Sequence, residues 1–391
     1  MSQQAENVLA ALTTILPQLG DKAATYERQR KLPYDGIGLL RPTGIFTLRV
    51  PEEHGGAGGT LHQQMAAITA IASVDSNLAQ AIRPHFFFIE ELRVHGLGST
   101  ATAWWPTMVE GALIGNALSE ASTSRVGDIT STLSQQADGS WQLNGVKAYS
   151  TGSLFATLLY VAGQDAEGIR RTALIPANRD GVTLNDDWDG MGQRLTASGT
   201  SYFKDVRVEA SELLSFHALD DRFTHIGGQR QLFLSAVLAG IALNASSDIN
   251  HYLSGKARPS AHGLTAKASD DPFFLRTAGE VSSAAWASRA VVLAAADSLD
   301  IAARQPENEA AALSAAIDVA RAQVAVADLV LPATTRIFNA GGASAVRDEL
   351  NLHRHWRNAQ TVVAHNPLDY KRWAVANWEV NHIQPPRTSY F

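Results

Sequence analysis

The stretch HRHWRNAQTVVAHNP, residues 353–367, gathers three histidines, two arginines and a tryptophan that could bind a metal, contact nucleic acid or exchange protons. On a helix, His353 and His355 would point to different sides, and His365 is too far along the chain for the short ligand repeats of zinc sites. The chain has no cysteine and no HExxH motif. We therefore predict no metal site.

The charge balance argues against a nucleic-acid partner. The chain carries 32 basic and 38 acidic residues, a net charge of -6, and has no basic run with interleaved aromatic residues. We interpret His353, Arg354, His355 and Arg357 as a structural polar cluster, with phosphate or subunit contact as the alternative. For His365 two interpretations stay open: acid–base chemistry, or capping of a helix that begins near Asn366 and Pro367.

A second group of polar residues occurs between residues 111 and 208, where short alternating runs predict strands. Two of these strands end in amide and hydroxyl side chains, and the ends could meet at one edge of a sheet: Asn116 and Ser119 on one, Ser150, Thr151 and Ser153 on the other. Such an edge suits a flat heteroaromatic ligand, with Tyr149 covering a ring face. An ordinary solvated surface is the alternative.

Three kinds of segment must position these residues. Residues 1–112 read as helices separated by Gly/Pro breaks. Residues 113–213 alternate in the manner of strands, with hairpin turns at Asp138-Gly139 and Asn144-Gly145. Residues 214–391 contain long alanine-rich helical segments, typical of a bundle buried on several sides, other subunits included. The expected fold is α+β: an N-terminal helical domain, a middle β domain and a C-terminal four-helix bundle.

The first residues, MSQQAENVLAALTTILPQLGDKA, have helical spacing and contain acids, unlike a targeting peptide. No uninterrupted apolar run reaches the length of roughly 18 residues that a membrane span needs. Lack of cysteine is compatible with a reducing compartment. We expect a cytoplasmic protein with no membrane partner.

Four separated motifs, in order along the chain, resemble the acyl-CoA dehydrogenase superfamily. They are ALSE followed by DITSTL, then NGVKAYST, then DWDGMGQRLTASGTSYFKDVRV, and finally GGAS with HRHWRNAQT and HNP. More narrowly, they are similar to its flavin monooxygenase branch, typified by dibenzothiophene monooxygenase and a sulfur-acquisition oxidoreductase family. The resemblance covers about residues 30–385. It implies the same three-part fold, with the middle domain a β-barrel.

The resemblance also implies a site. Residues 117–119 and 149–151 would line the isoalloxazine ring, with Asn116 and Ser150 near its reactive edge. Trp188 would lie near the active site, and Arg258 would reach a flavin phosphate across a subunit boundary. His85 and His365 would be the two active-site histidines, although the RPHFFF context of His85 also suits a core position. The full set implied for flavin contact is Asn116, Leu118, Ser119, Tyr149, Ser150, Thr151, Trp188 and Arg258.

Departures from the dehydrogenases favour oxygen chemistry. Those enzymes use a glutamate base in a position where this chain reads VAHNP, with His365 and Asn366. The other known glutamate location falls within residues 228–240, GQRQLFLSAVLAG, which has no carboxylate. Loss of the base removes a proton transfer worth on the order of a hundredfold. A histidine with a pKa of about 6.5 could instead govern the proton of a flavin C4a-(hydro)peroxide near neutral pH.

Neither EEHGGAGGT nor GGAS is a GxGxxG motif within a βαβ unit, so no nicotinamide-binding domain is expected. We therefore expect a two-component monooxygenase that takes reduced FMN from a separate NAD(P)H:flavin reductase, with FAD as the alternative flavin. Its other reactants would be O2 and a small apolar substrate, organosulfur or indole-like by resemblance. A homotetramer is also implied by the resemblance. The competing hypotheses are an acyl-CoA dehydrogenase or oxidase with a relocated base, and a non-catalytic member of the fold.

Overall fold

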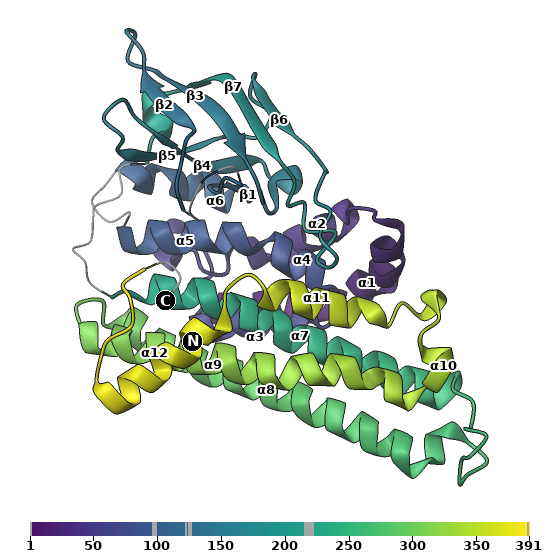
Figure 1. The fold of residues 1–391 in the computed structure, drawn as a ribbon. Coiled ribbons are helices and arrows are strands. Elements are labelled where there is room, and N and C mark those ends of the chain that lie inside the picture. The colour runs from purple at the N-terminus through teal and green to yellow at the C-terminus, as the bar shows by residue number, and fades with distance from the viewer. Residues whose placement is uncertain (1, 96–99, 122, 124–126, 215–222, 389–390) are drawn as a thin grey trace.

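The chain forms helices, then a sheet, then helices again (Figure 1). The computed structural model describes residues 2–95, 100–121, 123, 127–214, 223–388 and 391. The helices that precede the sheet are α1 (Gln3–Gln29), α2 (Tyr34–Leu40), α3 (Leu61–Ala72), α4 (Ser76–Ala81), α5 (Arg83–His95) and α6 (Trp105–Val109).

Side-chain caps fix the starts of α3 and α4. Thr60 and Gln63 form a capping box at the start of α3. Asp75 caps α4 by accepting hydrogen bonds from the backbone N–H groups of Asn77 and Leu78. These caps satisfy amides that have no partner within their helix, and the second cap sets the position of the first turn of α4.

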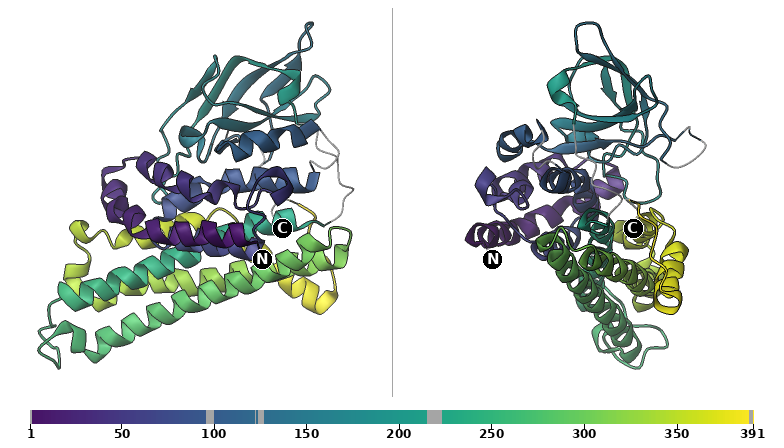
Figure 2. Two further views of the ribbon diagram at one scale, coloured as in Figure 1. Left: turned by 180° about the vertical axis from the view of Figure 1, so that it is seen from behind. Right: turned by 90° about the vertical axis from the view of Figure 1, so that its left-hand side faces the viewer.

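The middle region is a curled, seven-stranded sheet (Figure 2). Its strands are β1 (Ile114–Ala117), β2 (Thr132–Gln135), β3 (Trp141–Lys147), β4 (Leu158–Gln164), β5 (Arg170–Pro176), β6 (Val182–Leu184) and β7 (Ser201–Val208). The strand order is β1-β4-β2-β3-β7-β6, and β5 pairs with β4. The sheet curls around a core that includes Leu133, Leu143, Val161 and Phe203. Phe203, Val206 and Val208 of β7 lie in that core, and the three-residue step from Phe203 to Val206 coincides with a register shift between β7 and β3.

The C-terminal region is a bundle built around α7. Its helices are α7 (His225–Gly255), α8 (Pro272–Arg304), α9 (Glu309–Arg336), α10 (Gly342–Ala345), α11 (His353–Val363) and α12 (Leu368–Asn381). Two helices, His225–Gly255 and Glu309–Ala340, have the length and composition of a membrane span. Most of each apolar stretch is buried within the protein, as in core helices. The alanines allow close approach of α7, α8 and α9.

Helix α5 lies between the sheet and the bundle (Figure 1). The ring centroids of Phe88 and Tyr160, on β4, are 5.4 Å apart. On the other side, Phe86 lies 6.0 Å from Phe233 of α7. Both faces of α5 are therefore buried, and its first residue, Arg83, contacts His365 of the segment between α11 and α12. The predicted fold class and order of regions are confirmed.

Candidate active site

The two predicted strand ends lie side by side. The N–H of Ala148 donates to the carbonyl of Ser119 over 2.9 Å, and the N–H of Asn116 donates to the carbonyl of Thr151 over 3.0 Å. Asn116 is half-buried and Ser119 is exposed. Leu118 packs its side chain against the apolar cluster that contains Phe88. The backbone thus brings together the segments 116–119 and 148–152.

Tyr149, Ser150 and Thr151 differ sharply in environment. Tyr149 has a left-handed backbone, with φ of 55°, and its side chain is 54% exposed. A left-handed tyrosine is strained, which is frequent at binding sites. The hydroxyl of Ser150 is fully buried and has no hydrogen-bond partner. The hydroxyl of Thr151 is 2.9 Å from that of Ser198.

These residues fit the edge of a flavin. A buried hydroxyl without a partner is unfavourable, and an incoming polar edge would satisfy the Ser150 Oγ. The exposed ring of Tyr149 offers a face for stacking, and Trp188 lies edge-on to it at a centroid distance of 6.0 Å. The donor set is polar and uncharged, which suits a neutral heteroaromatic edge rather than a metal.

Replacing Ser150 by alanine should separate binding from stability. Because the Ser150 Oγ has no partner within the protein, its removal should leave the free energy of unfolding unchanged or slightly higher. FMN affinity should fall roughly 3- to 10-fold, the value of one hydrogen bond. Thermal unfolding without flavin and fluorescence titration with FMN would measure both. Destabilisation with unaltered FMN affinity would contradict the assignment.

The loop from Asn185 to Thr200 holds the Tyr149 segment through backbone hydrogen bonds. Trp188 Nε1 donates to the carbonyl of Gln193 over 2.9 Å. The carbonyls of Thr196 and Gly199 accept hydrogen bonds from the N–H groups of Gly152 and Ser150. The position of Tyr149 and Ser150 therefore depends on this loop.

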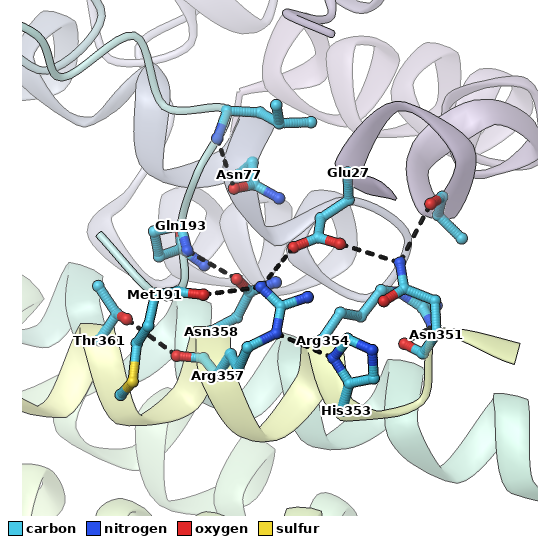
Figure 3. A network of polar contacts seen from close by, with 12 residues as sticks. Glu27, Asn77, Met191, Gln193, Asn351, His353, Arg354, Arg357, Asn358 and Thr361 are labelled. Carbon is cyan, nitrogen blue, oxygen red and sulfur yellow. Dashed lines mark hydrogen bonds and ion pairs between the residues drawn. The ribbon is translucent and has the colours of Figure 1, made fainter. Parts of the chain in front are cut away.

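Helix α11 holds the same loop from the other side (Figure 3). Arg357 Nη1 donates to the carbonyl of Met191 over 2.7 Å, and Asn358 Oδ1 accepts from the N–H of Gln193 over 2.7 Å. A Cβ on Gly192 would lie 2.2 Å from the carbonyl oxygen of Arg357, so only glycine permits this approach. We call Arg357, Asn358 and Glu27, the partner of Arg357, the α11 clamp.

Glu27, near the end of α1, anchors the clamp. Its carboxylate lies 2.8 Å from Arg357 Nη1 and accepts a hydrogen bond from Asn351 Nδ2 over 2.9 Å (Figure 3). Burial alone would raise the pKa of Glu27, but Arg357 and Asn351 hold that pKa below its ordinary value. The carboxylate therefore stays charged and pairs with the arginine.

The other basic residues of the HRHWRN motif are also engaged within the chain. Arg354 Nη2 and His355 Nε2 both lie on Asp248 Oδ2, at 2.6 and 2.9 Å. Burial, with the charge of Arg354, lowers the pKa of His355 to about 4. His353 Nδ1 accepts from Arg357 Nε. These contacts favour the structural interpretation of the motif over phosphate binding.

His365 lies between α11 and α12; the residue as a whole is exposed, although surrounding protein desolvates its ring. Its Nε2 is 3.1 Å from Nη1 of Arg83, the first residue of α5. Desolvation by surrounding protein, aided by the charge of Arg83, lowers the pKa of His365 to about 3. The expectation that this histidine titrates near neutral pH is therefore wrong. So is the capping alternative, because α12 begins at Leu368 and has no side-chain cap.

His85 lies in the core, fully buried. Its Nε2 donates to the carbonyl of Phe46 over 2.7 Å, and its ring contacts the edges of Phe46 and Phe86. Nδ1 has no hydrogen-bond partner, and burial lowers the pKa of the ring to about 4. Arg83 and His85 are two residues apart on α5 and point to different sides. The residue that contacts His365 is thus Arg83 and not His85.

The buried imidazole of His85 should make the protein sensitive to acid. Below pH 6.5 the unfolded chain takes up a proton that the folded chain refuses until about pH 4. Stability is therefore lost as the pH falls through this window, by about 2–3 kcal/mol between pH 7 and 4.5. His85→Gln keeps a donor for Phe46 and cannot titrate. Between pH 7 and 4.5 its free energy of unfolding, measured with denaturant, should therefore fall by that much less than in the native protein. Equal losses in both proteins would contradict this account.

The surface beside His365 is charged. Along α5, Arg83, Phe87 and Glu91 share one side, and the guanidinium carbons of Arg83 and Arg230 lie 4.3 and 5.2 Å from the Phe87 ring centroid. Glu91 forms an ion pair with Arg230. The next carboxylate, Glu90, is buried and pairs with Arg49. Both carboxylates of α5 are therefore engaged by arginines, which argues against a relocated catalytic base there.

Arg258 is not near the other predicted residues of its own chain. It is exposed, in the loop 256–271 between α7 and α8. That loop lies at the end of the bundle remote from the sheet (Figures 1 and 2). Contact with a flavin bound beside Ser150 would therefore have to come from a second copy.

Two further features bear on the site. A cavity of about 690 Å³ lies at the other end of α5, where Leu92, Trp105, Phe223 and His225 line it, and it includes none of the predicted flavin residues. Within the described residues, no group of three or more His, Asp or Glu side chains is placed to hold a metal ion.

Arg83, Arg230 and Asn358 were missed by the sequence reasoning. The only hint was that Arg83 stands beside His85 in RPHFFF.

Comparison with known proteins identifies the family. Residues 11–112, 116–206 and 232–370 match the N-terminal, middle and C-terminal domains of acyl-CoA dehydrogenase. The chain is 30% identical to the "Probable FMNH2-dependent monooxygenase SfnC" of Pseudomonas putida, over 98% of this chain and 97% of that protein.

Two solved structures are also similar over almost the whole chain. FMN-bound TdsC from Paenibacillus sp. A11-2, a dibenzothiophene monooxygenase, is 29% identical with a TM-score of 0.88, over 98% of this chain and 100% of that one. Methanesulfinate monooxygenase MsuC from Pseudomonas fluorescens is 27% identical with a TM-score of 0.87, over 100% of both chains. This chain therefore belongs to the acyl-CoA dehydrogenase superfamily and, within it, to the flavin-dependent monooxygenase branch.

Proposed function

We propose that the protein is the oxygenase of a two-component monooxygenase, which uses reduced FMN and O2 to place one oxygen atom on a small substrate. The observation that carries this proposal is the residue at the dehydrogenase base position. A histidine, His365, stands there in contact with Arg83, while Glu90 and Glu91 of α5 are bound to arginines. Chemistry at activated oxygen needs no carboxylate base, whereas removal of a proton next to a thioester does.

The residues of the sheet edge would hold the cofactor. Reduced FMN, when bound, supplies the electrons that activate O2. Asn116 and the unpartnered hydroxyl of Ser150 would orient its polar edge, and Tyr149 with Trp188 would cover the ring. FMN is favoured over FAD because TdsC was solved with FMN bound. His365 would present a polar hydrogen beside the reacting oxygen, and the surrounding protein would limit access of water.

A separate NAD(P)H:flavin reductase would supply the reduced flavin, since the sequence has no dinucleotide-binding motif. We further propose a cytoplasmic homotetramer. Several apolar side chains are exposed on α8 and α12, among them Phe273, Trp286 and Trp373 at 59%, 71% and 57%. Large apolar surfaces of this kind mark subunit contacts. Such assembly would bring Arg258 of one subunit to the flavin phosphate of another.

For the substrate, the relatives point to small sulfur compounds or indoles. TdsC has been crystallised with FMN and indole together, and MsuC is named for methanesulfinate. We propose an organosulfur or indole-like substrate for this chain.

The test is oxygen consumption by the purified protein with chemically reduced FMN and a panel of organosulfur and indole compounds. Mass spectrometry should show a product heavier by one oxygen atom, labelled when ¹⁸O₂ is supplied. If the protein instead carries tight FAD that acyl-CoA bleaches without oxygen or reductase, the dehydrogenase hypothesis is correct. Failure to bind oxidised or reduced FMN would indicate a non-catalytic protein.

A further inference from the structure

The contact between Arg83 and His365 restricts the chemistry of the histidine. Nη1 of Arg83 lies 3.1 Å from Nε2 of His365. A guanidinium group has only donors, so Nε2 must accept the hydrogen bond with its lone pair. An imidazolium has no lone pair to offer. The contact therefore requires a neutral ring, and a neutral ring whose Nε2 accepts carries its proton on Nδ1.

We propose that Arg83 is a positioning residue, which holds His365 as a neutral imidazole with its proton on Nδ1. The assignment concerns residues of this chain alone, but its consequence for catalysis rests on the proposed function. In that role His365 donates its one hydrogen bond from Nδ1, which Asn366 accepts in the protein without flavin and which the reacting oxygen would accept in its place. It neither releases a proton as an imidazolium nor accepts one at Nε2.

Arg83 is itself held in place on several sides. It is buried, with 7% of its surface exposed. Its Nη2 donates to the carbonyl of Arg230 on α7 over 3.3 Å, and its guanidinium carbon lies 4.3 Å from the Phe87 ring centroid. A guanidinium fixed by a carbonyl and an aromatic face cannot turn away from His365 without losing both contacts.

The opposite side of the ring supports the same tautomer. Asn366 Nδ2 donates to Gln231 Oε1, which also accepts from Gln323 Nε2 over 3.2 Å. The Asn366 side chain also hydrogen-bonds to His365, and this bond raises the pKa of the ring, as a bond accepted from a ring N–H does. An amide oxygen accepts hydrogen bonds, so it suits Nδ1–H.

The charges around His365 also disfavour a second proton. Arg83 of α5 contacts the ring directly. Arg230 of α7 contacts Arg83 through its backbone carbonyl, and the guanidinium of Arg230 pairs with Glu91. Asn366, the next residue in the chain, is neutral. Lys371 is the basic residue on the following helix, α12. The low pKa of His365 agrees with these surroundings.

The proposal is tested without flavin, by magic-angle-spinning NMR of sedimented protein labelled with ¹⁵N-histidine. A His365→Gln spectrum assigns the resonance. We expect His365 of the native protein to show Nδ1 protonated and Nε2 unprotonated, unchanged from pH 5 to 8. Arg83→Met should give a mixture of tautomers and a titration at higher pH than in the native protein, since one of the two causes of the low pKa is removed and desolvation remains. Arg83→Lys, which keeps a charged donor, should resemble the native protein.

A native His365 with its proton on Nε2 would overturn the proposal, and this result needs no variant to fold. An unchanged tautomer and titration in a folded Arg83→Met protein would also overturn it. With flavin and substrate, the product formed per O2 consumed should be flat from pH 6 to 8 in the native protein and pH-dependent in Arg83→Met. Absence of product in the native protein would refute the proposed function, while the NMR result would still decide the tautomer.

Discussion

His365→Ala should lower the rate of product formation about 100-fold or more, the usual cost of removing one positioned hydrogen-bond donor beside the reacting atom. FMN affinity should stay within about threefold, because the predicted flavin contacts lie on the sheet edge and not on this loop. Reduced FMN would still react with O2, so oxygen should be consumed and released as hydrogen peroxide. The two products, measured together by mass spectrometry and a peroxide assay, should change in opposite directions.

The matched control is His251→Ala, which removes an exposed histidine on α7. Its product yield and peroxide release should equal those of the native protein. If His365→Ala keeps the native rate and yield, the histidine has no part in the reaction. If its FMN affinity falls as steeply as its rate, the loss is one of cofactor binding.

Glu90→Ala should have the largest effect on stability, about 3–5 kcal/mol, because it leaves a buried arginine without its partner. Glu90 is fully buried. Arg49 Nε and Nη2 donate to its two carboxylate oxygens over 2.6 and 3.1 Å, and His225 Nε2 lies 3.0 Å from one of them. Burial alone would raise the pKa of Glu90, but Arg49 and His225 hold it well below its ordinary value. The carboxylate is therefore charged at every pH at which the protein functions.

A double variant separates the effect of the unpaired charge from the effect of the cavity. Arg49→Met combined with Glu90→Leu removes both charges and keeps apolar volume, so the double variant should be much more stable than Glu90→Ala. Urea unfolding at neutral pH would measure all three proteins. A Glu90→Ala loss below about 1 kcal/mol would show that water or a rearranged side chain compensates Arg49.

The order of helices, sheet and bundle was predictable because periodicity reports which faces are buried. The meeting of residues 116–119 with 148–152 was also predictable, since both follow strands of one sheet. The α11 clamp was not. Contacts such as that of Asn358 with Gln193 join segments far apart in the sequence, and no local pattern encodes them.

The histidines show the same limit. Residue type alone predicted an ordinary imidazole at His365, but the pKa depends on Arg83, which a sequence cannot place beside it. For His85, the FFF context did suggest the core position that the structure has. Its catalytic role, like the flavin contacts of Arg258, stays a prediction.

The α11 clamp also ties the first helix to the flavin region. Glu27 belongs to α1, yet through Arg357 and Met191 it helps to hold the loop on which Tyr149 rests. Removing N-terminal residues, or fusing a tag that displaces α1, would therefore loosen the position of Tyr149 without changing any residue of the flavin region. Substitutions meant to widen the substrate range should therefore leave that helix intact and alter Trp188, which lies edge-on to Tyr149.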